Sequence, residues 1–174
     1  MIAAMTRDDP DGAAAAEAEP DFEALVAPEV GRLFGIAVTI LRDRAEAEDA
    51  VQETLTRAWT RQSTLRDAVA RRAWLTRICV NYCISRRRRL LRLPQPFADP
   101  PRPPIGTWDL DARGLDLDRA YAALSARQRA ALLLFYHHGH SVEECGELMS
   151  CAPGTVRSHL ARALTALRKE MRDA

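Results

Sequence analysis

Residues Ser141–Leu167 read SVEECGELMSCAPGTVRSHLARALTAL, and this stretch decides the fold. Its apolar spacing predicts two helices joined by a tight turn at residues 150–152, because Pro153 suits the first position of a helix. This is the pattern of a helix-turn-helix, whose second helix has the right size for the major groove of DNA. Gly146 falls where the two helices should pass closely.

Polar side chains at the start of the last helix are expected to project away from its apolar stripe: Thr155, Arg157, Ser158 and Arg162. An arginine can donate two hydrogen bonds to a guanine edge, and serine or threonine suits phosphates or either base. The alternative is a helical hairpin whose arginines only solvate the surface. The pattern therefore indicates a candidate reader of DNA.

The chain has 174 residues, enough for one ordinary domain or two small ones. Its composition, 47% hydrophobic and 28% charged, favours a folded core over disorder. The formal net charge of +1 conceals a segregation of charge: residues 1–20 and 43–53 are mostly acidic, whereas arginines crowd residues 86–92 and the C-terminal end. Basic clusters beside acidic surfaces suit a protein that meets nucleic acid at two places and a basic protein at another.

No apolar run is expected to span a bilayer, and the N-terminal stretch lacks the basic-then-apolar pattern of a signal peptide. Four cysteines are too few for a disulfide-stapled secreted domain. We therefore expect a soluble, intracellular protein.

Helical periodicity begins at Asp21 and continues to Leu41, with apolar residues at three- and four-residue spacing. Pro28 is expected to break this stretch or to start its second part. Asp43 with Glu46 predicts a capping box that opens a second helix, which ends near residue 59.

A third helix is predicted from about Ala68 to Leu91. Its apolar stripe consists of Leu75, Ile78, Cys79, Tyr82 and Cys83. This leaves another face for polar side chains: Arg77, Asn81, Ser85 and Arg88.

Six prolines within residues 94–104 predict an extended, semi-rigid linker. Beyond it, Ser125 with Gln128 and Ser141 with Glu144 predict two capped helices before the last one. No convincing strand is found. The sequence predicts an all-α fold of two small helical domains, the second containing the helix-turn-helix: a disordered acidic tail at 1–20, a first domain at 21–92, a linker at 93–115 and a second domain at 116–174.

An acidic stretch on the second helix places Asp49, Gln52 and Glu53 on one face, where carboxylates could grip arginines of a partner. The alternative is a solvated helix face. On the third helix, Arg86–Arg89 could neutralise phosphates or could simply favour the helix C-terminus. Trp74 could stack on an unpaired base, although such aromatics more often belong to a core.

The cysteines lie at apolar helical positions: Cys79, Cys83, Cys145 and Cys151. They are expected to pack as small hydrophobes, because consecutive-turn positions hold disulfide geometry poorly. A zinc site that also uses His137, His138 or His140 lacks the usual close cysteine pair. No phosphate-cradling glycine loop, nucleophile elbow or metalloprotease helix occurs. The sequence therefore predicts no enzyme, no cofactor and no metal site.

Four segments together, in this order, resemble the extracytoplasmic-function (ECF) sigma factors of the sigma-70 family, which are promoter-recognition subunits of bacterial RNA polymerase. They are AEAEDAVQET (Ala45–Thr54), RAWLTRICVN (Arg72–Asn81), LSARQRAALLL (Leu124–Leu134) and GTVRSHLARALTALR (Gly154–Arg168). The similarity covers about Asp21 to Arg168, apart from the linker.

The resemblance implies a role for each matching residue. The clamp helices of the polymerase would contact Asp49, Gln52 and Glu53. Residues 65–72 would form the loop that receives a flipped base. The melted strand of the −10 element would be captured by Arg72, Trp74, Arg77, Asn81, Arg86, Arg87 and Arg88. The −35 element would be read by Thr155, Arg157, Ser158, His159 and Arg162.

Three departures from the family pattern bear on the DNA contacts. Leu65–Ala70 reads LRDAVA where the family usually shows Phe-Arg-Gly and then Ser-Phe-Arg. Ser85 replaces a common acid, and His159 stands where arginine is frequent. The preferred −10 sequence and the loop residue that touches the flipped base therefore stay open.

The resemblance also implies partners: core RNA polymerase through its clamp helices and flap, promoter DNA and an anti-sigma factor, but no small-molecule substrate. The protein would act in the cytoplasm, and the anti-sigma factor could hold it near the membrane. One alternative is a stand-alone helix-turn-helix regulator, which would bind a duplex operator as a symmetric dimer. Another is a redox- or zinc-responsive regulator that uses the cysteines.

Overall fold

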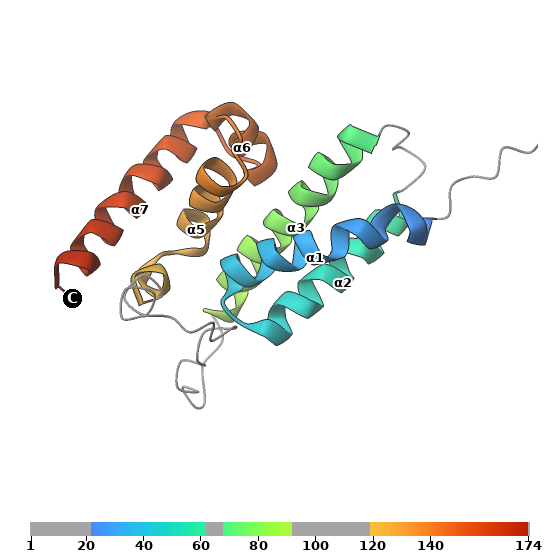
Figure 1. The fold of residues 1–174 in the computed structure, drawn as a ribbon, viewed down its shortest axis with the longest axis horizontal. Helices are drawn as coiled ribbons and strands as arrows, with labels where there is room; N and C mark the ends of the chain where they lie inside the picture. The colour runs from blue at the N-terminus through green and yellow to red at the C-terminus, as the bar shows by residue number, and fades with distance from the viewer. Residues whose placement is uncertain (1–21, 62–67, 92–118, 174) are drawn as a thin grey trace, which may run out of the picture.

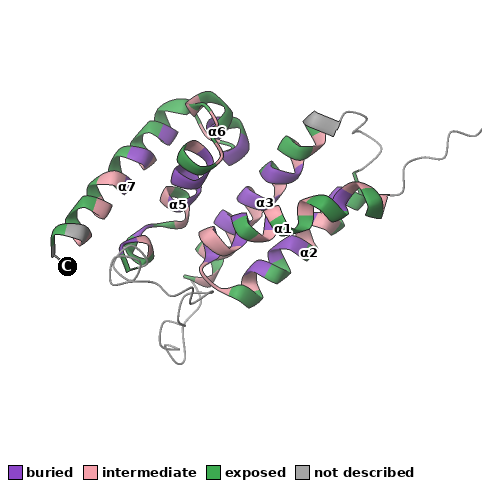
Figure 2. Cartoon of the chain, viewed as in Figure 1, coloured by how far each residue is buried: buried purple, intermediate pink, exposed green. Residues whose placement is uncertain are grey.

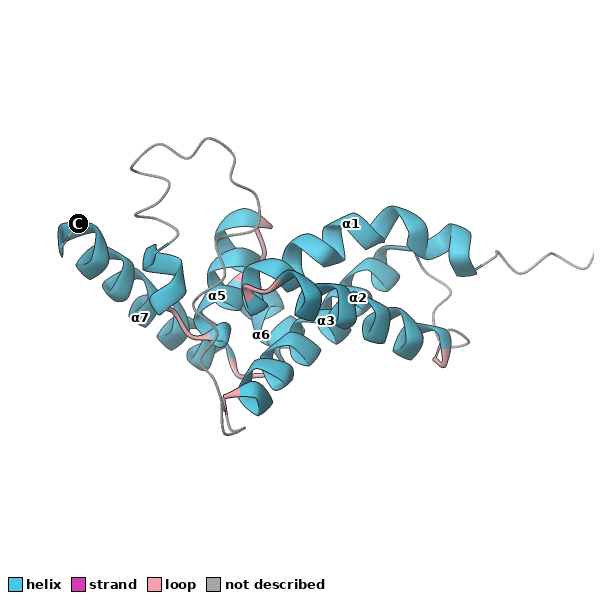
Figure 3. Ribbon diagram, turned by 90° about the horizontal axis from the view of Figure 1, so that it is seen from below, coloured by secondary structure: helices cyan, strands magenta, loops and turns pink. Residues whose placement is uncertain are grey.

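The structure, a computed structural model, describes residues 22–61, 68–91 and 119–173. The predicted tail, the linker and most of the predicted −10 loop lie outside these residues. Within them, all regular structure is helical, as the sequence predicted (Figures 1 and 3). The elements are α1 (Phe22–Leu41), α2 (Arg44–Trp59), α3 (Ala68–Leu90), a helical stretch at residues 119–123, α5 (Ala126–Leu132), the π-helical turn η2 (Leu133–His137), α6 (Val142–Met149) and α7 (Pro153–Asp173).

Helix α1 runs without interruption through Pro28, so the prediction that this proline breaks the stretch is wrong. Proline removes one main-chain donor and crowds the preceding turn. The helix tolerates it because Pro28 is exposed, and Ala24, whose carbonyl loses its helical donor, is exposed as well. Water can bind that carbonyl, while Leu33 and Ile36 bury the opposite side of the helix.

One helix, α1, is long and apolar enough to cross a membrane, so the expectation that no segment has this length and composition is wrong. Helix α1 has 20 residues and a mean hydropathy of 1.7 over its most apolar window. A core helix of a folded domain passes the same test, and α1 packs against α2, α3 and α5.

The chain turns sharply between α1 and α2. Arg42 adopts a left-handed conformation (φ 58°), and its N–H donates to the Val38 carbonyl at 2.8 Å. Asp43 then caps α2 by accepting a hydrogen bond from the Glu46 N–H at 3.0 Å. This is one half of the predicted capping box. The Glu46 carboxylate, which would form the other half, binds Arg86 of α3.

Both capping boxes predicted in the C-terminal half are confirmed. The Ser125 hydroxyl accepts from the Gln128 N–H, and the Gln128 side chain accepts from the Ser125 N–H. The same reciprocal pair joins Ser141 and Glu144 at 3.1 and 2.7 Å. Gly139, with a φ of +71°, ends the preceding helix as expected of a glycine cap. These caps fix where α5 and α6 begin, and thus how the helix-turn-helix is placed.

The turn of the helix-turn-helix depends on Gly146. Ser150 ends α6 in a left-handed conformation (φ 51°), and the Cys151 N–H donates to the Gly146 carbonyl at 2.9 Å. A Cβ atom on Gly146 would lie only 2.8 Å from the Cys151 carbonyl oxygen. The predicted close approach of the two helices therefore occurs at this residue.

The two helical units share one hydrophobic core. Figure 1 shows α1–α3 side by side with α5–α7, and α3 contacts both α5 and α6. Figure 2 shows buried positions on the sides of the helices that face one another. Val80 and Ile84 of α3 are buried although they lie outside the predicted stripe. They are buried because α3 is covered on a second side by the C-terminal unit.

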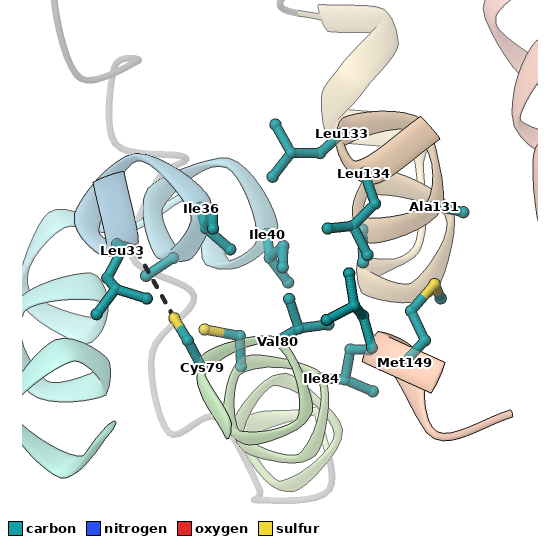
Figure 4. Close-up of a cluster of buried hydrophobic side chains, with 14 of the residues drawn as sticks. Leu33, Ile36, Ile40, Cys79, Val80, Ile84, Ala131, Leu133, Leu134 and Met149 are labelled. Atoms are coloured by element: carbon teal, nitrogen blue, oxygen red, sulfur yellow. Dashed lines mark hydrogen bonds between the residues drawn. The ribbon is translucent and has the colours of Figure 1, made fainter. Parts of the chain in front are cut away.

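Figure 4 shows how this contact is built. Ile36 and Ile40 of α1, Leu133 and Leu134 of η2, and Val80 and Ile84 of α3 meet in one buried cluster, with Met149 of α6 beside it. Complete burial of one such aliphatic side chain contributes about 1.5–3 kcal/mol. The apolar contact between the units is therefore a substantial part of the stability of this arrangement.

We predict that Gly146→Ala lowers the free energy of unfolding by about 1–3 kcal/mol, because the added methyl group meets a main-chain oxygen that cannot move alone. Gly154→Ala is the matched control: nothing lies within 4 Å of its Cβ, and alanine favours the helix. Urea unfolding of the full chain, followed by circular dichroism, measures both. Equal stability of the two variants would contradict the close approach.

Candidate nucleic-acid interface

The first turns of α7 carry an exposed polar face. Thr155, Arg157, Ser158 and Arg162 are all exposed. They are held in place because Val156, Leu160 and Ala163 are buried beneath them against α5 and α6. Figure 2 shows exposed and buried positions alternating along α7. The structure thus brings together four of the five residues predicted for the −35 element.

Arg157 binds Glu143 of α6 through its Nη2 atom at 3.0 Å, and both side chains are well exposed. An exposed ion pair contributes little, about 0–1 kcal/mol, so Arg157 can exchange this partner for DNA at small cost. The sequence analysis did not single out Glu143, although its place on α6 is part of the helix-turn-helix pattern.

The structure does not bring His159 into this group. Its side chain is half-buried, and its Nε2 atom is inaccessible, with no hydrogen-bond partner among the described residues. Burial, then the positive charges of Arg127 and Arg162, lower the pKa of His159. A neutral imidazole packed toward α5 supports the position of α7 and offers DNA less than an exposed arginine.

The second candidate surface is one face of α3, where residues at three-, four- and seven-residue spacing line up: Trp74, Arg77, Asn81 and Arg88. Arg77 and Arg88 are exposed, whereas Trp74 is half-buried and packs against the core. The Asn81 amide donates to the Arg77 carbonyl at 2.8 Å and to the Leu148 carbonyl of α6 at 2.9 Å. Asn81 is therefore a contact between the two helical units.

The remaining arginines predicted for the −10 element lie in different surroundings. Arg86 forms two hydrogen bonds with the Glu46 carboxylate, at 2.6 and 3.0 Å, and so fastens α3 to the start of α2. Arg87 is half-buried. Arg72 is largely exposed, 3.6 Å from Glu29 of α1. The structure thus places Arg86 in an ion pair between α3 and α2, away from the row of Trp74, Arg77, Asn81 and Arg88.

The third candidate surface is the acidic face of α2. Asp49 and Gln52 are exposed, and Glu53 is partly exposed and pairs with Arg57 at 2.7 Å. Ala47, Ala50 and Val51 bury the opposite side of the helix. The three predicted polymerase-binding residues therefore share one accessible face.

Arg129 of α5 is the residue that sequence reasoning missed. Its side chain is 2% exposed. Nε and Nη2 donate to the Ile40 carbonyl of α1 at 2.9 and 2.6 Å, and Nη1 donates to the carbonyls of Leu124 and Tyr121. The signal was its position, because Arg129 lies three and four residues before Leu132 and Leu133 in an apolar stripe.

Burial is the main cause of the shifted pKa of Arg129, and the positive charges of Arg87 and Arg42 add to it. Together they lower the pKa to about 10. The guanidinium therefore remains charged at neutral pH. Its acceptors within the described part of the chain are main-chain carbonyls near helix C-termini, where the helix dipole is negative.

Three of the four cysteines are packed inside the helical core. Cys79, Cys83 and Cys145 are buried, Cys151 is half-buried, and all four are free thiols. The Cys79 thiol lies 3.7 Å from the Leu33 carbonyl (Figure 4). A hydrogen bond with Cys79, together with burial, raises the pKa of Cys83, and burial raises the pKa of Cys145 to about 11. The Cys83 and Cys145 thiols are therefore expected to react slowly with oxidants.

Among the described residues, no group of three or more His, Cys, Asp or Glu side chains could hold a metal ion. The histidines predicted as possible zinc ligands lie at the end of η2, where the rings of His137 and His138 pack edge to face, 5.2 Å apart. The His137 and His138 rings therefore pack against each other.

His138 lies beside the contact between the two units. Burial lowers its pKa, and the positive charges of His137, Arg32 of α1, His140 and Arg72 of α3 lower it further. Arg32 itself binds Glu29 and the Thr76 hydroxyl, and so joins α1 to α3. A proton on His138 would add a positive charge next to these arginines.

Comparison with known proteins agrees with the resemblance seen in the sequence. The profile of Sigma-70 region 2 matches residues 25–92, and that of Sigma-70, region 4 matches residues 114–167. The chain is 36% identical over 168 residues to the ECF RNA polymerase sigma factor SigL of Mycobacterium tuberculosis, covering 93% of this chain and 94% of that protein.

Solved structures show the same fold. The sigma factor RpoE from Bartonella quintana, in complex with the anti-sigma factor NepR, superposes with a TM-score of 0.66 at 29% identity, over 87% of this chain and 97% of that chain. CnrH, in complex with the cytosolic domain of CnrY, superposes with a TM-score of 0.59 at 24% identity, over 87% and 88% of the two chains.

We predict that the folded chain loses stability as the pH falls through about 6.5, partly because of His138. Its pKa is lower in the folded than in the unfolded chain, so the unfolded chain binds more protons there and acid favours unfolding. Urea midpoints at pH 7.5 and 5.5 measure this. The loss should be smaller for His138→Gln than for the wild type, and an equal loss would show that another group is responsible.

Proposed function

The chain belongs to the ECF sigma factors of the sigma-70 family, which bind core RNA polymerase and direct promoter recognition and strand opening, and we propose that it divides these tasks among α2, α7 and α3. The observation that carries this assignment is the presence of three separate polar faces. Each of them is backed by buried apolar residues of the same helix.

The face of α7 is proposed to read the −35 element. Its exposed row of Thr155, Arg157, Ser158 and Arg162 supports this, because side chains at the start of a recognition helix contact base edges in the major groove. Arg162 is the strongest candidate for a base contact. His159 is proposed to support the helix from beneath.

The face of α3 is proposed to capture the melted strand of the −10 element. Asn81 can offer both donors and acceptors to an unpaired base, and Arg77 and Arg88 flank it with positive charge. Arg86 is proposed to position α3 through Glu46, and Trp74 to support it by packing. The acidic face of α2 is proposed to bind basic residues of the polymerase clamp helices through Asp49, Gln52 and Glu53.

We propose that the protein has no catalytic activity of its own and acts in the cytoplasm, where it meets polymerase and DNA. An anti-sigma factor is proposed as a further partner, since the relative from Bartonella quintana was solved in complex with one. Two modest DNA contacts on one chain are sufficient, because polymerase raises the effective concentration of the second once the first has formed.

Replacement of Arg162 by Ala is predicted to weaken recognition of the −35 element by about 1–3 kcal/mol if the guanidinium contacts a base edge. The measurement is transcription by reconstituted holoenzyme on a library of −35 variants, read by sequencing. Arg168→Ala, which removes an exposed arginine farther along α7, is the control. A loss that is uniform across all −35 sequences would assign Arg162 to a phosphate instead.

Replacement of both Asp49 and Glu53 by Ala is predicted to abolish co-purification with core polymerase and, with it, promoter-dependent transcription. The α2 helix should remain folded, because both side chains lie on its accessible face. Glu48→Gln, which removes a charge from the same helix, should bind as the wild type does. If wild-type holoenzyme starts no more transcripts than core polymerase alone, the proposed function is wrong.

A further inference from the structure

We propose that Glu143 of α6 sets the selectivity of Arg157, so that Arg157 favours a matching base pair of the −35 element over a contact with any phosphate. The inference rests on the role proposed above for α7. Glu143 is a positioning residue in it, because its carboxylate affects DNA recognition through the Arg157 guanidinium.

Glu143 brings a negative charge to the polar face of α7. Residues 153–169, which form most of that helix, contain no acid. Helix α6 packs against α7 and supplies the acid from outside (Figure 1). The Glu143 Oε1 atom accepts a hydrogen bond from Arg157 Nη2 at 3.0 Å. Both side chains are 63% exposed, so the ion pair lies on the surface where the recognition helix would meet DNA.

The backbone on both sides of this ion pair is held in place. Ser141 and Glu144 form the capping box that begins α6, and Cys145 is buried directly after it. On α7, Val156 is buried next to Arg157. Because a cap and buried residues hold these two helix ends, the fold itself sets the carboxylate beside the guanidinium.

The ion pair occupies only part of the Arg157 guanidinium. A guanidinium has five N–H groups in a planar fork, and two of its edges can each donate two parallel hydrogen bonds. One hydrogen bond from Nη2 to Glu143 engages one of these edges and leaves the other for a base. Such an edge fits the O6 and N7 acceptors of guanine. Arg157 can therefore read a guanine without leaving Glu143.

A phosphate contact is less favourable while Glu143 is present. The intact ion pair is neutral overall and attracts a phosphate only weakly. The exposed pair is also easily broken, so Arg157 can leave Glu143 for a phosphate. However, the first helix of a helix-turn-helix crosses the DNA backbone, and the Glu143 carboxylate would then face other phosphates without its partner. Repulsion between like charges opposes this contact, and so the carboxylate disfavours binding that ignores the sequence.

The test compares holoenzymes reconstituted from core polymerase and the full chain, on a promoter library randomised at the −35 element. Arg157→Ala identifies the base pair that Arg157 reads. Glu143→Gln removes the charge and keeps the size of the side chain. Glu147→Gln, which removes an exposed charge one turn farther along α6, is the matched control. Transcripts are counted by sequencing, and circular dichroism confirms that each variant is folded.

Glu143→Gln is expected to raise initiation from sequences mismatched at the base pair that Arg157 reads, relative to matched sequences. The preference at that base pair should fall about 3- to 10-fold, a part of the roughly 5- to 150-fold that one bidentate base contact supplies. Preferences at the other −35 positions should stay as in the wild type, and the control should match the wild type throughout. In the Arg157→Ala background, Glu143→Gln should change no preference, because the side chain on which it acts is gone.

Four results would overturn the proposal. Arg157→Ala could lose no base preference, or Glu143→Gln could keep every wild-type preference. A uniform loss across all −35 sequences in Glu143→Gln would assign this residue a purely structural role. A changed preference at a base pair other than that of Arg157 would make Glu143 a direct reader. Initiation by wild-type holoenzyme tests the proposed function separately, because each of these results is measured with a holoenzyme that starts transcripts at the promoter.

Discussion

The arrangement of the two helical units depends on the buried guanidinium of Arg129, which donates hydrogen bonds to both of them. A buried charge is costly unless polar groups replace its water, and Arg129 meets carbonyls at the ends of two helices. One belongs to α1 in the N-terminal unit, and the others, Tyr121 and Leu124, lie in and just after the helical stretch at residues 119–123 of its own unit. Because the acceptors are main-chain atoms, the contact specifies where one helix end lies against another, and its loss would remove the donor that the Arg129 side chain gives to the Ile40 and Leu124 carbonyls.

This anchoring determines how α3 is used. The helix is packed by α1 and α2 on one side and by α5 and α6 on the other, so its polar face forms a narrow row between two buried surfaces. Asn81 lies at the edge of that row, where the second unit reaches it. The packing of α3 between the two units therefore brings the Asn81 amide within hydrogen-bonding distance of α6. The position of α3 and the hydrogen bond of Asn81 to α6 therefore share one structural cause.

Much of the fold could be predicted because its signals are local. Caps at Ser125 and Ser141, the glycine at residue 146 and Pro153 at the start of α7 each act within a few residues of the chain. The faces of α2 and α7 followed from helical periodicity. Periodicity, however, reports one buried side for each helix, and it therefore missed Val80 and Ile84, which a distant unit covers.

The same limit explains which contacts at the candidate site the sequence could not predict. Arg86 and Glu46 are 40 residues apart, and Arg129 and Ile40 are 89 apart, so no local pattern links them. Pro28 was misjudged for a related reason, since its effect depends on whether the surrounding turn is exposed. His159 looked like its neighbours in sequence, but its angular position on α7 turns it toward α5. In each case the deciding partner belongs to another element.

A chain assembled in this way can be selective without binding DNA tightly by itself. If the unit that reads duplex DNA and the unit that captures a melted strand were permanently separated, each could occupy nonspecific sites throughout a genome, since phosphate contacts alone give measurable affinity. A contact between the units that competes with one of these activities reduces such binding by the fraction of chains in which the contact is formed.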